Sequence, residues 1–400
     1  MTWQKVKLSD IGSISRGRSK HRPRNAPELY GGEYPFIQTA DVKNADLYLT
    51  TYTQTYNETG LAQSKLWSKG TMCITIAANI ADTCILGIDA CFPDSIIGFV
   101  PDDQKCDIKY VKYKFDFDVQ RQYQQMSQGA TQDNLSQEKL LSFQFEIPTL
   151  DIQKKVAGIL AAYDDLIENN RRRIALLEKM ASELYRERFV REGGCLDEVG
   201  LMECSFISFC TSRIKKYDGT KRYLATADVD GRSIVGHGEL LQYDELPSRA
   251  QMLPELYSVW FARMSASYKI LAFSDSNADL IGELILSSGF AGFKSDKEHW
   301  PYVRSFFSSE WFNSEKDRFA TGATQISITN DGLTRIKIPV PQEKDVVEYA
   351  RLVNPIFCEV DLLKKQSANL ARQRDRLLPR LMSGKIDLDK LVKGEEVENG

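Results

Sequence analysis

Two long stretches of the chain carry apolar residues at alternating spacings of four and three, the pattern of a helix that pairs with another helix. The first pattern begins at Val156 and the second at Tyr349, 193 residues later and in the same phase. We therefore predict two coiled-coil helices that pair with each other. The seam positions are Val156, Leu160, Tyr163, Ile167, Asn170, Ile174, Leu177 and Leu184 in the first helix, and Tyr349, Val353, Ile356, Val360, Leu363, Leu370 and Leu377 in the second.

The ends of these helices are marked by residues that disfavour helix. Gly193-Gly194 is expected to end the first helix, and Pro379 with Gly384 to end the second, because glycine and proline commonly follow the last helical turn. Pro355 lies inside the second pattern and predicts a kink or an early interruption, since proline lacks the N–H that an interior turn needs. Each helix has roughly 40 residues and a length of ~60 Å.

Other positions on the helices modify the seam. Asn170 sits on the seam itself, and we interpret it as a residue that sets the register of the pair rather than as a ligand. Ile159, Leu166, Leu352 and Leu362 extend the apolar face beyond the seam. We expect these four to pack against the globular parts of the chain.

The chain also repeats itself outside the helices. Four motifs recur in the same order at offsets of 187 to 193 residues, and loop insertions would explain the small changes in offset. One tetrapeptide could recur by chance, but collinear motifs indicate a duplicated unit. The pairs are Thr39-Ala-Asp-Val42 with Thr226-Ala-Asp-Val229, Tyr110-Val-Lys112 with Tyr302-Val-Arg304, Gly129-Ala-Thr-Gln132 with Gly322-Ala-Thr-Gln325, and Phe143–Pro148 with Ile336–Pro341.

The segments between the helices are of mixed secondary structure. Residues 95–100, 143–147 and 335–340 alternate or are rich in β-branched and aromatic residues, so we predict strands. Residues 107–126 fit a strand or a helix, and their length favours a helix. The predicted fold class is α+β, with two mixed α/β domains separated by a pair of long antiparallel coiled-coil helices in a pseudo-twofold repeat. The predicted boundaries are 1–148 for the first domain, 149–192 for the first long helix, 193–341 for the second domain, 342–384 for the second long helix and 385–400 for a tail.

Composition narrows the class of protein. Of 400 residues, 42% are hydrophobic and 27% are charged, as in soluble globular proteins. No signal peptide is recognised, and the most apolar stretch, 72–92, is interrupted by Asn79, Asp82 and Asp89, so we expect a cytoplasmic protein without a membrane span. The eight cysteines form no C-x-x-C pair, which argues against zinc and for reduced, buried thiols.

Positive charge gathers at one equivalent place in each half, shortly before the Thr-Ala-Asp-Val motif. The net charge is −3, which argues mildly against a free-standing nucleic-acid binder, so the location of the cations matters more than their number. Gly, Pro and Ser around them predict loops, where Arg and Lys can contact phosphates and Arg can read guanine. A solvated surface would explain either loop alone; two at one repeat position favour nucleic acid. The candidates are Arg16, Arg18, Lys20, Arg22 and Arg24 with Lys43 in the first half, and Arg213, Lys215, Lys216, Lys221 and Arg222 in the second.

The repeated Gly-Ala-Thr-Gln motif is a second candidate contact. Thr131 and Gln132, and their counterparts Thr324 and Gln325, could contact phosphate or an adenine edge. The glycines could equally turn the chain, with Thr and Gln capping backbone groups. Both interpretations remain open at this point.

No catalytic constellation is found in the sequence. No Gly-rich loop follows a predicted strand, and no Walker-type Gly-Lys-Ser/Thr run occurs. Asn354-Pro355-Ile356-Phe357 has some likeness to the Asn-Pro-Pro-aromatic motif of adenine methyltransferases, but it falls in the heptad pattern and lacks the second proline.

The arrangement resembles the specificity subunit of type I restriction–modification systems over nearly the whole chain. The resemblance is carried by Gly129–Gln132 with Phe143–Pro148, by the first long helix (Gln153, Ile159, Leu160, Asp164, Ile167, Leu177, Lys179, Leu184 and Phe189), by Leu377–Ile386 near the C-terminus and by the opening Trp3-x-x-Val6-x-Leu8-x-Asp10-Ile11. The second domain lacks the tryptophan-containing opening, so its first strand is not located.

The resemblance implies a non-catalytic reader of double-stranded DNA. Each domain would be a target-recognition domain for one half of an interrupted site, and the coiled coil would set their spacing. The partners implied are modification subunits, two of them by symmetry, and restriction subunits. S-adenosylmethionine, ATP and Mg would bind in these partners. Within the same class, the chain could instead read for a methyltransferase without a restriction partner. From another class, it could be a coiled-coil scaffold for protein or RNA partners.

Overall fold

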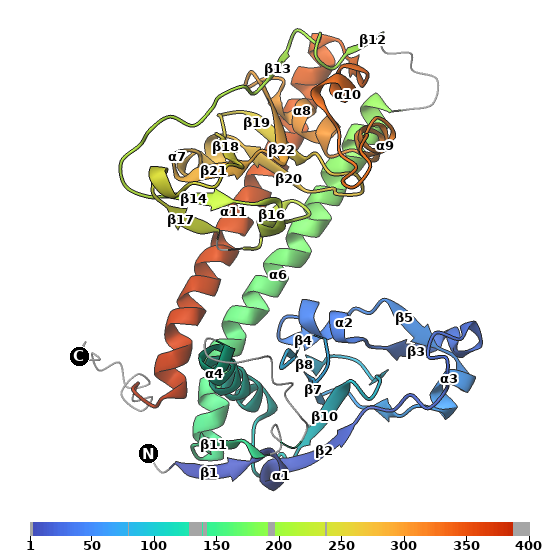
Figure 1. Cartoon of the computed structure of the whole chain (residues 1–400), viewed down its shortest axis with the longest axis vertical. Helices are drawn as coiled ribbons and strands as arrows, with labels where there is room; N and C mark the ends of the chain where they lie inside the picture. The colour runs from blue at the N-terminus through green and yellow to red at the C-terminus, as the bar shows by residue number, and fades with distance from the viewer. Residues whose placement is uncertain are drawn as a thin grey trace. The chain divides into compact units, whose positions relative to one another are not determined.

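The computed structural model forms two compact units (Figure 1). It describes residues 3–78, 80–127, 138, 142–190, 197–236 and 238–386. Unit 1 comprises Met1–Glu168 and Ala368–Gly400, and unit 2 comprises Asn169–Ser367. Two helices of 40 residues, α6 (Leu150–Phe189) and α11 (Glu343–Met382), each contribute one segment to either unit. Among the described residues, no helix combines the length and the apolar character needed to cross a bilayer.

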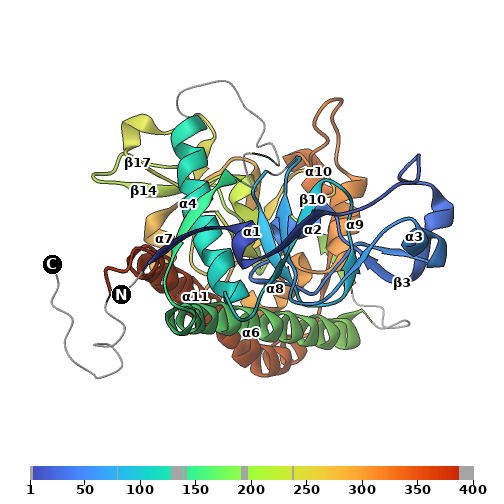
Figure 2. The same ribbon diagram turned by 90° about the horizontal axis from the view of Figure 1, so that it is seen from below.

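Unit 1 is built on two sheets. The larger has the order β2-β10-β7-β8-β4, the smaller the order β5-β3-β9-β6, and β1 pairs with β11 beside them. Helix α4 packs against β8 and β11 and can be followed in Figure 2. The elements are β1 (Gln4–Lys7), α1 (Leu8–Ile11), β2 (Gly12–Arg16), η1 (Pro27–Leu29), β3 (Tyr30–Phe36), α2 (Thr39–Asn44), β4 (Tyr48–Leu49), β5 (Gln54–Tyr56), α3 (Glu58–Ala62), β6 (Leu66–Trp67), β7 (Met72–Thr75), β8 (Thr83–Leu86), β9 (Ala90–Cys91), β10 (Ile96–Pro101), α4 (Ile108–Ser127) and β11 (Gln144–Ile147).

Unit 2 repeats this plan. Its sheets have the orders β13-β22-β19-β20 and β17-β14-β21-β18, and β12 pairs with β23 as β1 pairs with β11. The elements are β12 (Asp197–Gly200), β13 (Ile207–Phe209), β14 (Lys221–Leu224), η2 (Thr226–Asp228), β15 (Val229–Asp230), β16 (Ser233–Ile234), β17 (Glu239–Leu241), η3 (Tyr243–Glu245), β18 (Ala250–Met252), β19 (Ser258–Ala262), β20 (Ile270–Phe273), η4 (Asp275–Asn277), α7 (Asp279–Glu283), β21 (Leu284–Ser287), β22 (Phe290–Ser295), α8 (Trp300–Phe307), α9 (Glu310–Arg318), α10 (Asn330–Thr334) and β23 (Lys337–Val340).

The predicted strands and the predicted helix of the first half are confirmed as β10, β11, β23 and α4. The strand that the sequence did not locate, the first of the second half, is β12. It pairs with β23 in the same antiparallel way as β1 pairs with β11. The internal duplication is therefore a duplication of the fold.

The repeated Thr-Ala-Asp-Val motif has a structural reason in both units. The carboxylates of Asp41 and Asp228 each accept a hydrogen bond, 2.8 Å long, from the backbone N–H three residues earlier. This closes the first turn of α2 and of η2. Val42 and Val229 are buried just after the turn. In each unit the motif thus begins a helical turn after a strand and places its valine in the core.

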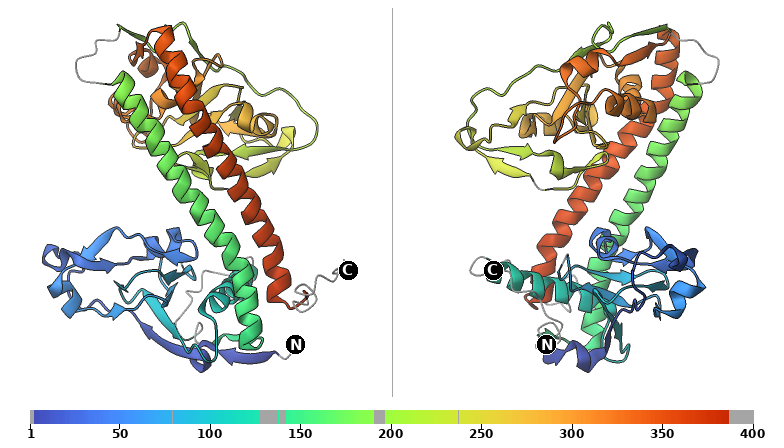
Figure 3. Two further views of the ribbon diagram at one scale, coloured as in Figure 1. Left: turned by 180° about the vertical axis from the view of Figure 1, so that it is seen from behind. Right: turned by 45° about the vertical axis from the view of Figure 1, so that its right-hand side comes forward.

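The two long helices are antiparallel, as predicted, and run side by side in Figure 3. In unit 2, Asn170 Nδ2 donates to Ser367 Oγ at 3.3 Å, whereas Arg188 pairs with Asp345 at 3.2 Å, so partners run in opposite directions along the chain. In unit 1, Arg374 pairs with Asp164. All of the seam positions of both helices are buried or half-buried, Asn170 included.

Three expectations about the helices are wrong. α11 continues without interruption through Pro355 and extends three residues beyond Pro379. Both prolines are exposed, where water can satisfy the carbonyls left without an N–H partner. The expected glycine end is correct, because Gly384 has a φ of +69° and follows the last turn. Gly193-Gly194 lies outside the described residues.

The third error concerns Leu166, Leu352 and Leu362, which are about half exposed at 51%, 52% and 49% and do not pack on the globular parts. Other positions do so: Tyr185 from α6 and Phe357 from α11 are buried in the core of unit 2. Ile159 does pack against the core of unit 1.

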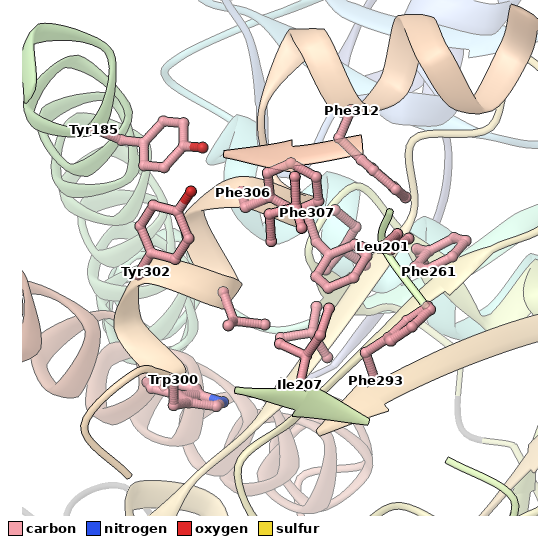
Figure 4. Close-up of a cluster of buried hydrophobic side chains, with 14 of the residues drawn as sticks. Tyr185, Leu201, Ile207, Phe261, Phe293, Trp300, Tyr302, Phe306, Phe307 and Phe312 are labelled. Carbon is pink, nitrogen blue, oxygen red and sulfur yellow. The ribbon is translucent and has the colours of Figure 1, made fainter. Parts of the chain in front are cut away.

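Aromatic side chains fill the core of unit 2 (Figure 4). Tyr185 from α6 faces Tyr302 from α8, with ring centroids 5.7 Å apart. Phe261 of β19 and Phe307 of α8 stack at 5.4 Å. Because large rings contribute most of the buried apolar surface, the long helix is an integral part of this core.

Gly292 of β22 provides a test of the packing. A Cβ at this position would lie 2.5 Å from the ring of Trp260, whereas a Cβ on Gly282, in α7, would meet nothing within 4 Å. Gly292→Ala should therefore destabilise unit 2 by ~1–3 kcal/mol, and Gly282→Ala should be neutral or stabilising by up to ~1 kcal/mol. Urea unfolding followed by tryptophan fluorescence measures both. Equal midpoints for the two variants would contradict this account of the glycine.

Candidate nucleic-acid interface

The basic loop of unit 1 leaves the larger sheet at one edge. This edge carries the end of β2, the start of β10 and the loop 76–82 between β7 and β8. The loop backbone is pinned by bonds from Gly17 N to Ile96 O at 2.8 Å and from Arg18 N to Phe92 O at 2.9 Å. A Cβ on Gly17 would lie 2.3 Å from the carbonyl oxygen of Pro93, so only glycine fits there.

The predicted cations of this loop divide into two groups. Arg22 donates to the carbonyl of Ser19 at 2.7 Å, and Arg24 pairs with Asp94 at 2.6 Å, so both hold the loop itself. The side chains of Arg16, Arg18 and Lys20 are exposed and have no hydrogen bond or ion pair within the described structure. These three are the cations available to an anionic ligand. Lys43 is exposed on α2. Burial raises the pKa of Asp82, and the nearby charge of Lys43 opposes that rise.

In unit 2, four of the five corresponding cations line a pocket of about 450 Å³. Lys221 donates to the carbonyl of Gly282 at 2.7 Å and lies 5.5 Å from the centre of the Tyr217 ring. Arg213 bonds the side-chain oxygen of Gln251. Among the described residues, no carboxylate lines this pocket, which is formed by Ser212, Arg213, Ile214, Lys215, Lys216, Tyr217, Lys221 and Leu253.

Lys215 and Lys216 are exposed and have no partner among the residues that the structure describes. Arg222 lies on β14, outside the pocket lining. A concave surface with several cations and no carboxylate favours a phosphate group.

The second Gly-Ala-Thr-Gln motif forms an exposed loop, 321–327. Thr321 and Ser327 close it by two backbone bonds of 3.0 Å. Gly322 has a φ of +138°, which explains the glycine. The side chains of Thr324 and Gln325 are exposed and cap no backbone group in the described part of the chain. The first copy, with Thr131 and Gln132, lies outside the described residues.

One further element, the hairpin loop at each of these sheet edges, was not predicted from the sequence. Loop 76–82 in unit 1 and loop 263–269 in unit 2 both lie at the edge where the basic loop leaves. Arg263, at the start of the second, donates to the carbonyl of Ile328 at 3.1 Å and so borders loop 321–327. Finding these loops from the sequence would have required a prediction of where the short strands on either side of each loop end.

Residues of the family-like helix motif tie α6 to α4. Gln153 is buried, and its Oε1 accepts from the backbone N of Asp107 at 3.1 Å, just before α4 begins. Tyr113 of α4 donates to Asp164, which also pairs with Arg374. Burial, together with the charge of Asp164, raises the pKa of Tyr113, so this hydroxyl stays a donor. These contacts hold α6 against α4 and α11.

The paired helices carry a second surface in unit 2, made of exposed apolar side chains. Leu176 and Met180 of α6 are 67% and 52% exposed, and Leu352 and Leu362 of α11 are 52% and 49% exposed. Helical spacing places Arg173 on the face of Leu176 and Met180, and Glu359 on the face of the two α11 leucines. Arg173 and Glu359 pair at 2.6 Å, so both faces lie on one side of the helix pair. We call these four side chains the helix patch.

Comparisons with known proteins agree with this architecture. A family model described as type I restriction modification DNA specificity domain matches residues 1–179. The type I restriction enzyme MjaIX specificity subunit of Methanocaldococcus jannaschii is 22% identical over 433 residues, which cover 97% of this chain and 94% of that protein. The HindI specificity subunit of Haemophilus influenzae is 26% identical over 177 residues, 42% of this chain and 38% of that protein.

In the described part of the chain, no three His, Cys, Asp or Glu side chains are grouped to hold a metal ion.

Among solved structures, the S subunit of a type I restriction–modification system from M. genitalium is 15% identical, with a TM-score of 0.54 and coverage of 95% of this chain and 96% of that chain. That likeness is one of fold. Residues 1–179 therefore carry a type I restriction modification DNA specificity domain, and the chain is similar over nearly its full length to a type I restriction enzyme specificity subunit.

Proposed function

We propose that this chain reads a bipartite, interrupted DNA target and catalyses no reaction itself. Each unit would contact one half of the target through the sheet edge from which its basic loop leaves. The observation that carries the proposal is the repetition of this edge: in both units, a basic loop with unpartnered cations leaves the sheet beside a hairpin loop. Two equivalent cationic edges in one chain suit two segments of one polyanion.

The exposed cations and the polar side chains of loop 321–327 would have different roles in DNA binding. Arg16, Arg18 and Lys20, like the lysines of the unit 2 pocket, suit phosphates, which fix position without reporting sequence. Thr324 and Gln325 are short polar groups on a closed loop, which suits a base edge. Affinity would come mainly from the first set and specificity from the second.

The long helices would set the spacing between the two half-sites and bind the catalytic partners. Because α6 and α11 each pass through both units, their length is the natural determinant of how many base pairs separate the halves. The helix patch would bind a modification subunit, since exposed apolar side chains on a helix pair are typical of protein contacts. The duplication favours two such subunits.

The chemistry would then belong to those partners. Methyl transfer to adenine from S-adenosylmethionine, and ATP- and Mg-dependent cleavage, would occur in modification and restriction subunits. This chain would supply the DNA sequence at which they act.

The unpartnered cations of unit 1 give a first test of DNA binding. The double variant Arg18→Gln/Lys20→Gln should weaken binding of the cognate duplex and reduce the slope of log K against log salt by roughly 1 per lost phosphate contact. Fluorescence anisotropy over a salt series measures both quantities. The sequence of the second half-site, mapped by methylation sequencing, should not change.

A matched control is Lys69→Gln, because Lys69 is exposed at the opposite edge of the same sheet, beside the start of β7. If the control lowers the affinity and the salt slope as much as the double variant does, the reading edge has been assigned wrongly.

The helix patch gives a second test. Met180→Glu/Leu352→Glu should weaken capture of the modification subunit at least ~10-fold, because two carboxylates would be buried without partners. Binding of the isolated chain to DNA should be retained. Met202→Glu, an exposed methionine at 41% outside the helices, is the control. Titration by surface plasmon resonance decides, and normal capture by the double variant would rule out this docking face.

A further inference from the structure

We infer that loop 263–269, between β19 and β20, is a preformed base-contacting element in which Met264 and Tyr268 meet duplex DNA while Lys316 and Asp317 hold the loop in shape. The inference rests on the proposed function and names the side chains that face the bases in the second unit. Lys316 and Asp317 act as positioning residues.

The loop holds a backbone conformation that needs support. Ala266, at its tip, has a φ of +55° and is exposed. Alanine rarely adopts this left-handed region, because its Cβ crowds the backbone. Such a conformation persists only where the surroundings impose it, and it is commonest at binding and switching sites.

A buried lysine imposes the conformation from the end of α9. Lys316 is only 1% exposed, and its ammonium donates to the carbonyls of Ala262, Met264 and Ser267 at 3.4, 3.0 and 2.5 Å. Burial lowers the pKa of Lys316, against the opposing effect of Asp317. A buried cation is costly unless its hydrogen bonds are satisfied, so the loop carbonyls must converge on it.

The neighbouring carboxylate completes the clamp. Asp317 Oδ1 accepts from the backbone N of Ala266 at 3.1 Å, and Oδ2 accepts from the hydroxyl of Tyr268 at 3.1 Å. Two consecutive residues of one helix therefore fix the carbonyls, the strained amide and one side chain of the loop. This is the preorganisation that a recognition loop requires.

The clamped loop presents apolar side chains to solvent. Met264 is 47% exposed and Tyr268 is 54% exposed. Ser265 N donates to Ile326 O at 2.9 Å, which joins this loop to the loop of Thr324 and Gln325. Thioether and aromatic groups beside polar tips suit thymine methyl groups and exposed base steps.

The position of the loop identifies the ligand as duplex DNA rather than a protein. The backbone bonds Cys210 N to Gly292 O at 2.8 Å and Arg263 N to Gly289 O at 2.9 Å bring the start of the basic loop and the start of this loop to one sheet edge. The cations that follow Cys210 include Lys215 and Lys216, which have no partner in the described structure. Free cations next to an apolar tip fit a polyanion that displays apolar base edges.

Unit 1 supplies an independent observation. Its hairpin loop in the same place, 76–82, contains two alanines with left-handed backbone, Ala78 with a φ of +62° and Ala81 with a φ of +68°. The strain recurs although the residues of the two loops differ. Two units that recognise different DNA sequences would need loops of similar backbone conformation that carry different side chains.

The experiment uses the complete chain with its modification subunits, and methylation sequencing to define the target. Met264→Ala and Tyr268→Ala should each lower affinity for the cognate duplex by at least ~5-fold or relax the second half-site. The first half-site should stay unchanged. Leu256→Ala is the matched control, since Leu256 is 42% exposed and precedes β19 at the opposite edge of the sheet.

The positioning residues are tested by specificity rather than by stability. Asp317→Ala should relax the second half-site at temperatures well below unfolding, and Tyr268→Phe, which keeps the ring, should do so less. Lys316→Met should behave like Asp317→Ala. If Lys316→Met does not fold, Asp317→Ala, Met264→Ala and Tyr268→Ala still test the inference.

Three outcomes would overturn the inference or its foundation. Suppose that Met264→Ala and Tyr268→Ala keep both the affinity for DNA and the target sequence, while Lys215→Gln/Lys216→Gln weakens DNA binding. The assignment of the loop is then wrong and the proposed function stands. If the lysine variant also has no effect, the proposed function fails for this edge. If Met264→Ala and Tyr268→Ala no longer bind a partner subunit but still bind DNA, the loop is a protein contact and the inference is wrong.

Discussion

Burial of the apolar seam between α6 and α11 is the interaction on which both units depend. A helix with such a stripe gains little from helix propensity alone and is stabilised by tertiary packing. In unit 1, Val156 and Leu160 share a core with Leu381 and Met382. In unit 2, Tyr185 joins Tyr349 in the same way. Because both helices contribute side chains to both cores, the contact between the two helices is part of the hydrophobic core of each unit.

Buried polar contacts fix the long helices against their neighbours in each unit. Arg304 of α8 pairs with Asp361 of α11 at 3.3 Å, and both side chains are almost fully buried. In unit 1, Asp164 is shared by Tyr113 and Arg374. Removing one member of such a set leaves an uncompensated buried charge, whereas sliding the helices breaks the set as a whole. We interpret these contacts as the reason that each sheet meets the helices in one register.

The duplication keeps the scaffold and varies the edges. The aspartate caps at Asp41 and Asp228, the sheet orders and the β1–β11 type of pairing recur. The basic loops and the hairpin loops keep their place but change their residues. This division suits the proposed function, since the same geometry would be presented twice while two different sequences are read.

Periodicity and repetition in the sequence were sufficient for the long helices, the duplication and several strands, because these depend on local spacing. The loops predicted around the cations are only partly correct, since Arg16 ends β2 and Lys221 and Arg222 begin β14. The sequence could not say which cations are free. Arg24 is held by Asp94, 70 residues away, and Arg18 has no partner in the described structure. Nor could it show that Pro355 is tolerated on an exposed face, or that Leu352 faces solvent. The clamp of Lys316 on a loop some 50 residues earlier is invisible in any pattern. Such features depend on contacts between residues remote in the chain, which only the folded structure brings together.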